Sequence, residues 1–172
     1  LLVIPAESLV VIGSNDGILY AYDAESGALQ WRFTTRGDIK MAPAYDPKRR
    51  LIAVTSMDGT CYVLNVADGT PVFARTTDAP IYASPVIAGD RLYIASLDKN
   101  IYAIRLDTYK DAWRYATGGR IFATPTVIHD TLWGGSNDGK LYGIAAATGE
   151  LVGSFQASER IVTKVVPGTA GE

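Results

Sequence analysis

Gly13-Ser14-Asn15-Asp16-Gly17 recurs, with small changes, at three further places in the chain. The serines of the four copies stand at positions 14, 56, 96 and 136, so successive copies are separated by 42, 40 and 40 residues. The other copies are Thr55-Ser56-Met57-Asp58-Gly59, Ala95-Ser96-Leu97-Asp98-Lys99 and Gly135-Ser136-Asn137-Asp138-Gly139. Self-similarity at a period of roughly forty residues indicates a repeat architecture.

The residues that surround this motif repeat with it. Each copy carries a tyrosine, a large aromatic residue and an isoleucine, and three of the four copies carry a proline. The four series are Tyr20, Tyr62, Tyr102 and Tyr142; Trp31, Phe73, Trp113 and Phe155; Ile39, Ile81, Ile121 and Ile161; and Pro43, Pro85 and Pro125, with Val165 in the last copy. This agreement indicates that one structural unit occurs four times.

Short apolar runs alternate with turn residues inside each unit, which is the pattern of successive β-strands. In the last complete unit we expect strands over 121–128, 132–136, 140–144 and 151–155. The runs over 19–22 and 141–144 are apolar on both faces, so each sheet must be covered on both sides. The lack of a 3.6-residue period excludes a helical solenoid.

Repeated four-stranded sheets that cover one another are typical of a β-propeller. We therefore predict an all-β chain of four antiparallel, four-stranded propeller blades. The expected blades cover 1–34, 35–76, 77–116 and 117–156, with an extra strand within 157–172.

The segment Ala21-Tyr22-Asp23-Ala24-Glu25-Ser26-Gly27, followed by Trp31, resembles the tryptophan-docking motif of the quinoprotein alcohol dehydrogenase-like (PQQ-like) repeat family. The resemblance covers nearly the whole chain. It implies that Trp31 and Trp113 join neighbouring blades, with Phe73 and Phe155 as weaker substitutes. Relatives close into rings of about seven or eight blades. The resemblance therefore implies a larger ring or an oligomer, and it favours a periplasmic or extracellular location.

The resemblance is less specific for function, because the family contains both noncatalytic propellers and dehydrogenases that use pyrroloquinoline quinone and calcium. By this resemblance, an enzymatic member would be expected to carry a vicinal cysteine pair beside the quinone. This chain has a single cysteine, Cys61. Cys61 shares its repeat position with Leu19, Ile101 and Leu141, so we interpret it as a small buried hydrophobe. We expect no catalytic residue and no cofactor in this segment. Membership of a quinone- and calcium-dependent dehydrogenase, completed by other blades, is the alternative.

Other polar residues have structural interpretations. Asp16, Asp58, Asp98 and Asp138 lie in hairpin turns, where aspartate bonds to the backbone, so we expect no metal site. His129 is the only histidine and has no nucleophile at a matching position. The 16 basic and 18 acidic side chains are scattered, which argues against a nucleic-acid partner. No apolar run approaches the roughly 18 residues of a membrane span.

The sequence varies most between the last strand of one unit and the first strand of the next. In propellers these loops gather with the hairpins on one face around the central channel. The candidate binding residues of this face are Arg36, Asp38, Lys40, Asp78, Tyr82, Arg120, Phe122, Glu159 and Arg160. Lys40, Tyr82 and Phe122 share their repeat position with Val162, and this mixed set could line a ligand entrance.

These observations favour a noncatalytic binding or scaffold module that contacts a protein partner or the remaining blades of its parent chain. A sensor of a sugar or another small ligand is a second alternative. The four units could close alone, pair with a second chain, or belong to a larger ring. Because an open half ring exposes apolar faces at both ends, we expect a fragment or a homo-oligomer.

Overall fold

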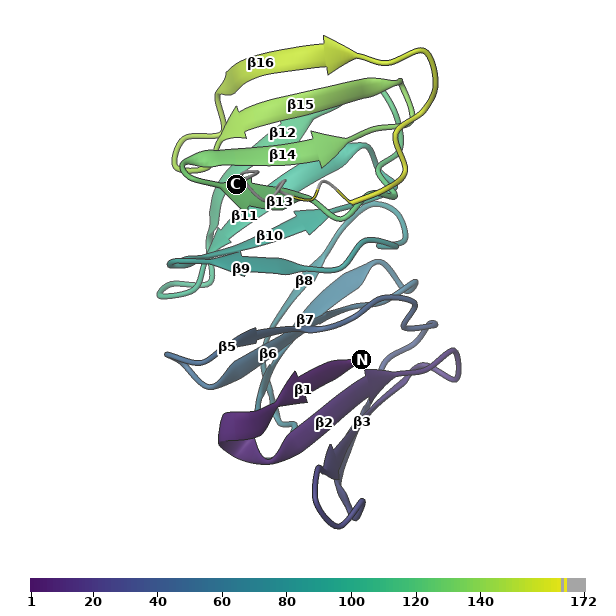
Figure 1. Ribbon diagram of the computed structural model, residues 1–172, viewed down its shortest axis with the longest axis vertical. Coiled ribbons are helices and arrows are strands. Elements are labelled where there is room, and N and C mark those ends of the chain that lie inside the picture. Colours follow the sequence, from purple (N-terminus) through teal and green to yellow (C-terminus); the bar gives the residue numbers. More distant parts are fainter. Residues whose placement is uncertain (165, 167–172) are drawn as a thin grey trace, which may run out of the picture.

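Residues 1–164 and 166, which the computed structural model describes, form four separate four-stranded antiparallel sheets (Figure 1). Each sheet consists of consecutive strands, so each contains one repeat. The sheets are β1 (Leu2–Ile4), β2 (Leu9–Gly13), β3 (Ile18–Asp23) and β4 (Leu29–Thr34); β5 (Ala44–Asp46), β6 (Leu51–Thr55), β7 (Thr60–Asn65) and β8 (Pro71–Thr76); β9 (Val86–Ala88), β10 (Arg91–Ala95), β11 (Asn100–Arg105) and β12 (Asp111–Ala116); and β13 (Thr126–Ile128), β14 (Thr131–Gly135), β15 (Lys140–Ala145) and β16 (Leu151–Gln156). A 3-10 turn, η1 (Pro5–Glu7), joins β1 to β2. The predicted all-β architecture of propeller-type blades is confirmed.

The sheets follow one another along the long axis of the molecule (Figure 1). The sheet of β1 to β4 lies at one end and the sheet of β13 to β16 at the other, so the four sheets do not close into a ring. The first sheet also has four strands of its own. The possibility that the four units close alone, with a terminal strand completing the first sheet, is therefore not what the structure shows.

The hydrophobic core is divided among the spaces between neighbouring sheets. One cluster joins Leu19 and Trp31 of the first sheet to Ile52 and Leu64 of the second, and two similar clusters join the second to the third and the third to the fourth. All five residues of β6 are buried because this strand is covered on both faces. The double-sided apolar strands therefore specify stacked sheets rather than one layer with a solvated face.

Large aromatic residues of the outer strands contact the next sheet. The indole N–H of Trp31 donates a hydrogen bond to the Val66 carbonyl at 2.9 Å, and Trp31 is only 8% exposed. The Trp113 indole makes the equivalent bond to Ala146 at 3.0 Å. Phe73 has no N–H and instead stacks on Tyr109, with ring centroids 5.0 Å apart. Outer-strand aromatics thus bridge each of the three junctions between neighbouring sheets.

The expectation that Phe155 is a fourth member of this series needs correction. Trp31 pairs with Ala21 across its hairpin, and the equivalent pair in the last sheet is Gly153 with Gly143. Phe155 pairs with Leu141, two residues further along β16. Its ring contacts Trp133 of its own sheet at 6.0 Å and is 63% exposed. Gly153, not Phe155, therefore occupies the docking position of the last sheet.

Two strand predictions also differ from the structure. The strand expected over 121–128 is confined to β13, since the segment before it bonds elsewhere: the N–H of Ile121 donates to the Ser96 carbonyl, and Pro125 has no N–H for a ladder. The extra strand is not formed over 157–164. The first strand of the second, third and fourth sheets starts five residues after the preceding isoleucine, as β5 does after Ile39. The corresponding strand would start at residue 166, so it falls almost entirely outside the described residues.

Candidate functional site

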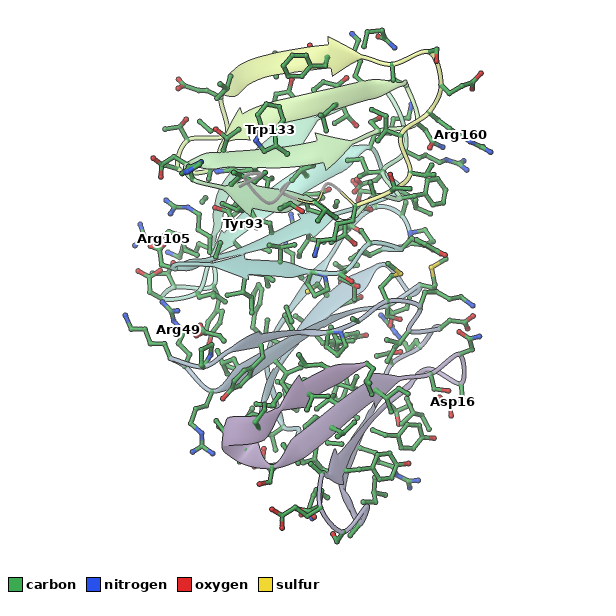
Figure 2. The ribbon with its side chains drawn as sticks, viewed as in Figure 1. Asp16, Arg49, Tyr93, Arg105, Trp133 and Arg160 are labelled. Carbon is green, nitrogen blue, oxygen red and sulfur yellow. The ribbon has the colours of Figure 1, made fainter. Side chains whose placement is uncertain are left out.

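One edge of the stacked sheets carries the connections that follow β4, β8, β12 and β16. The hairpins between the second and third strands of each sheet lie at the same edge. We call this edge the loop face; it comprises residues 14–17, 56–59, 96–99 and 136–139 of the hairpins and 35–43, 77–85, 117–125 and 157–164 of the connections. Asp16 and Arg160 lie on this side, whereas Arg49 and Arg105 lie on the opposite side (Figure 2). The repeat therefore brings the most variable residues of all four units to one face.

Repeated hydroxyl groups fix the backbone of the loop face. The Thr35 hydroxyl bonds to the carbonyls of Gly17 and Gly37, at 2.9 and 2.7 Å. The Ser56 hydroxyl reaches back to the same Gly37 carbonyl at 3.0 Å. Thr77 and Thr117 repeat the arrangement in the following units. These bonds hold the connections in place, so the side chains they carry are presented on an ordered support.

The hairpin aspartates latch each sheet to the loop of the preceding one. Asp58 accepts a hydrogen bond from the Arg36 backbone N–H at 2.9 Å and another from the Tyr62 hydroxyl at 2.7 Å. Asp98 and Asp138 receive the same two kinds of donor. Asp16, in the first of the described sheets, keeps its tyrosine bond at 2.8 Å. These carboxylates thus accept hydrogen bonds that stabilise the fold. No group of three or more metal-binding side chains occurs within residues 1–164 and 166.

The latch lowers the pKa of the inter-sheet aspartates. Burial pushes the pKa of Asp98 upward, but the hydrogen bonds from Tyr102, Asn100 and Asp78 outweigh burial, so the net pKa lies below the ordinary value. The pKa values of Asp58 and Asp138 are lowered for the same reason. A carboxyl group whose pKa is lower in the folded state stabilises the fold above the unfolded pKa of about 4. That stabilisation is lost as the pH falls through the folded pKa.

Asp98→Asn is expected to lower the free energy of unfolding by about 1–3 kcal/mol at pH 7, because an amide N–H₂ would face two donors. Asp16→Asn, which changes the same turn without an inter-sheet bond, is the matched control and should cost under about 1 kcal/mol. Urea unfolding at pH 7 and at pH 3 measures both. The deficit of Asp98→Asn should shrink at pH 3, because the carboxyl of the unfolded wild-type chain, with a pKa of about 4, is largely protonated there and the folded carboxylate loses part of its advantage. Equal deficits in the two variants would contradict the latch.

Four of the nine candidate residues gather in one place. Tyr82, Arg120, Phe122 and Arg160, together with Asn137 and Val162, line a groove of about 550 Å³ that we call the aromatic groove. A second, polar hollow of about 430 Å³ adjoins it and shares Asn137 and Arg160; Glu159 lies in its lining. The sequence grouped these residues by repeat position, and the structure shows that adjacent sheets place them side by side.

The other candidate residues are not part of the aromatic groove. Lys40 is neutralised by Asp38 at 2.6 Å and bonds to Asn15 at 3.1 Å. Asp78 faces the Arg114 guanidinium at 4.0 Å. Arg36 contributes its backbone N–H to the Asp58 latch. The candidate set therefore divides into residues that are already paired, such as Lys40 with Asp38, and a cationic, aromatic group from the second, third and fourth copies of the repeat that lines the groove.

Sequence reasoning missed two groups of residues. Phe33, Arg75 and Tyr115 occupy one repeat position and pack on the tyrosine of the next sheet: Phe33 on Tyr62 at 5.1 Å, Arg75 on Tyr102 at 4.8 Å and Tyr115 on Tyr142 at 5.7 Å. Arg75 also forms a two-bond ion pair with Asp111, at 3.0 and 2.8 Å. Phe155 is the fourth member of the column of Phe33, so Arg75 interrupts an otherwise aromatic series. Asn137 lies in the aromatic groove, whereas its sequence position predicts only a turn residue.

Cys61 lies in the core and has no exposed surface. It pairs with Thr55 across the second sheet, and burial raises the pKa of its thiol. A thiol that is held neutral and inaccessible is a poor nucleophile. The structure thus places Cys61 as the apolar repeat position requires.

One family model, described as outer membrane protein assembly factor BamB, matches residues 15–165. Among solved structures, the chain is similar to BamB from Moraxella catarrhalis, with a TM-score of 0.73 and 20% identity over 85% of this chain and 44% of that chain. It is also similar to the computationally designed Ika8 protein, with a TM-score of 0.80 and 15% identity over 91% of this chain and 49% of that one. At these identities the structural likeness shows the fold alone.

Two curated proteins share sequence with part of the chain. The beta-alanine-activating enzyme of Danio rerio is 32% identical over 105 residues, which are 58% of this chain and 9% of the enzyme. The Homo sapiens enzyme of the same name is 27% identical over 107 residues, which are 59% of this chain and 10% of the enzyme. The chain therefore spans about a tenth of the length of these relatives. No helix within residues 1–164 and 166 is long and apolar enough to cross a membrane.

Proposed function

Because the chain belongs to the repeat family described as outer membrane protein assembly factor BamB, we propose that it is a noncatalytic binding module whose loop face receives a protein partner. The observation that carries this proposal is that the polar groups on that face fall into two sets, one that stabilises the loops and one that is exposed. Threonine, serine and aspartate side chains fix the loops, while Arg120 and Arg160 remain exposed beside an aromatic groove. An ordered backbone with free cations and apolar side chains is suited to recognition.

The residues with potential chemistry support binding rather than turnover. The hairpin aspartates accept structural hydrogen bonds, and the single cysteine is buried. His129 is exposed in the turn between β13 and β14, on the opposite edge from the loop face. These groups do not converge on the aromatic groove, where a catalytic set would have to lie.

The relatives support a module that acts within a larger assembly. In the beta-alanine-activating enzymes, the similar segment is about a tenth of the protein. A propeller segment of that relative size fits a role in docking a partner or positioning a neighbouring domain. The loop face is the surface that such a role would use.

Site-specific photo-crosslinking in the source cells tests this function. Benzoylphenylalanine at Ser158, on the loop face, should give a discrete crosslinked protein, whereas the same group at Asp130, on the opposite edge, should not. Replacing Arg36, Arg120 and Arg160 together with alanine should reduce the Ser158 crosslink at least fivefold without changing thermal stability. Indistinguishable crosslinking from both edges would refute the proposal. So would dye reduction by the full-length parent with pyrroloquinoline quinone and calcium that is lost on substitution in this segment.

A further inference from the structure

The floor of the aromatic groove is apolar and exposed. Tyr82 and Phe122 meet edge to face with ring centroids 5.7 Å apart, and Val162 continues the same repeat position on the fourth unit. Tyr82 is 36% exposed and Val162 is 45% exposed. Exposed aromatic and branched side chains in a concave surface favour an apolar group of a partner.

The rim of the groove is cationic. Arg120 and Arg160 occupy one repeat position on adjacent units, and both are exposed. Neither forms an ion pair with a carboxylate within residues 1–164 and 166, whereas Lys40 on the first unit is neutralised by Asp38. Free guanidinium groups bind carboxylates through paired hydrogen bonds. The groove therefore favours an anionic partner at its third and fourth units.

Asn137, one of the residues that line the groove, carries an unused hydrogen-bond acceptor. The Oδ1 atom of Asn137 is buried and has no hydrogen-bond partner within the described residues. The Asn137 backbone N–H donates to the Arg120 carbonyl at 2.9 Å, which fixes this residue beside Arg120. A buried acceptor without a donor is costly, so a ligand that supplies an N–H would relieve it. A peptide backbone supplies such a group at every residue except proline.

The shape favours an extended ligand over a compact one. The aromatic groove continues into the polar hollow, because Asn137 and Arg160 belong to both. The polar hollow is lined by residues such as Gln156 and Ser158 and offers no second apolar floor. A ligand that fills both must be elongated, apolar at one end and polar at the other.

We propose that the aromatic groove binds an extended acidic peptide segment in which carboxylates flank an apolar side chain. The apolar side chain packs on Tyr82, Phe122 and Val162, the carboxylates pair with Arg120 and Arg160, and a backbone N–H bonds to Asn137. This inference rests on the proposed function and specifies the chemistry of the partner at the same face.

Selection from a displayed library of random decapeptides tests the proposal. The wild-type chain is the bait, and Arg120→Ala/Arg160→Ala is used for counter-selection. Recovered sequences should be enriched at least tenfold in motifs with Asp or Glu on both sides of an aromatic or aliphatic residue. Labelled peptides of the enriched sequence should bind the double variant at least tenfold more weakly than they bind the wild type. Peptides in which Asn and Gln replace Asp and Glu should bind the wild type at least tenfold more weakly than the acidic peptides do.

Arg32→Ala/Lys48→Ala is the matched control, because it removes the same charge from exposed positions outside the groove. It should change affinity less than twofold, and all variants should unfold at the wild-type temperature. A library that yields no sequences discriminating the wild type from the groove variant, or that yields basic motifs, overturns the proposal. If the Ser158 crosslink persists in that case, the binding-module function stands and only the acidic chemistry fails.

Discussion

Gly69→Ala is expected to lower the free energy of unfolding by about 2–4 kcal/mol, whereas Gly27→Ala, at the same repeat position, lowers it by about 1 kcal/mol. Both glycines have positive φ, at 70° and 71°, so an added side chain strains the backbone equally. A methyl group at Gly69 would lie 2.5 Å from the Trp31 indole, whereas one at Gly27 would meet nothing within 4 Å. The difference between the two variants therefore isolates the contact between sheets.

Urea unfolding of the two variants measures this difference, and Gly149→Ala provides a second case, since its methyl would lie 2.6 Å from the Trp113 indole. Trp31→Phe in the Gly69→Ala background should recover part of the loss, because the smaller ring leaves room for the methyl group. Equal losses of unfolding free energy in Gly27→Ala and Gly69→Ala would show that the Trp31 indole does not pack against the second sheet.

Much of the fold could be predicted from the sequence because the residues that build one unit recur by type. The serine, tyrosine and isoleucine series each perform one local task, so the same side chain is used every time. The isoleucine N–H bonds to the carbonyl of the motif serine that precedes it in all four copies, from Ile39 with Ser14 to Ile161 with Ser136. Such positions are visible in a single sequence because the requirement does not change between repeats.

The contacts between sheets were harder to predict because they depend on pairs of residues. A position such as Phe33, Arg75 or Tyr115 needs only to cover a tyrosine of the next sheet, and a ring or a guanidinium can do so. Its members therefore differ in residue type, and Arg75 interrupts a series that is aromatic at Phe33, Tyr115 and Phe155. The same ambiguity let Phe155 be assigned to the docking series, although the hairpin register gives that position to Gly153. The aromatic groove was predictable only in part, since Asn137 belongs to a turn motif that repeats for other reasons.

Phe73→Trp and Tyr109→Gly are expected to be destabilising separately and compatible together. Tyr109 holds the repeat position of Gly69 and Gly149, with φ at 54°, and it faces Phe73 where the glycines face tryptophan. An indole at position 73 would collide with the Tyr109 ring and cost about 1–3 kcal/mol. Tyr109→Gly relieves backbone strain but leaves Phe73 without its stacking partner, for a net loss of about 1–2 kcal/mol.

The double variant should recover most of both losses, since it recreates the arrangement of Trp31 on Gly69 and lets an indole N–H reach the carbonyl of Leu106, the counterpart of Val66. Urea unfolding of the wild type, the two single variants and the double variant completes the cycle. A coupling free energy of at least about 2 kcal/mol in the favourable direction is expected. Losses that add to within about 0.5 kcal/mol would show that the two positions are independent. Coupling would mean that each junction between sheets selects its outer-strand aromatic and the facing turn residue as a pair, which is why the docking position holds tryptophan where the facing turn residue is Gly69 or Gly149 and phenylalanine where it is Tyr109.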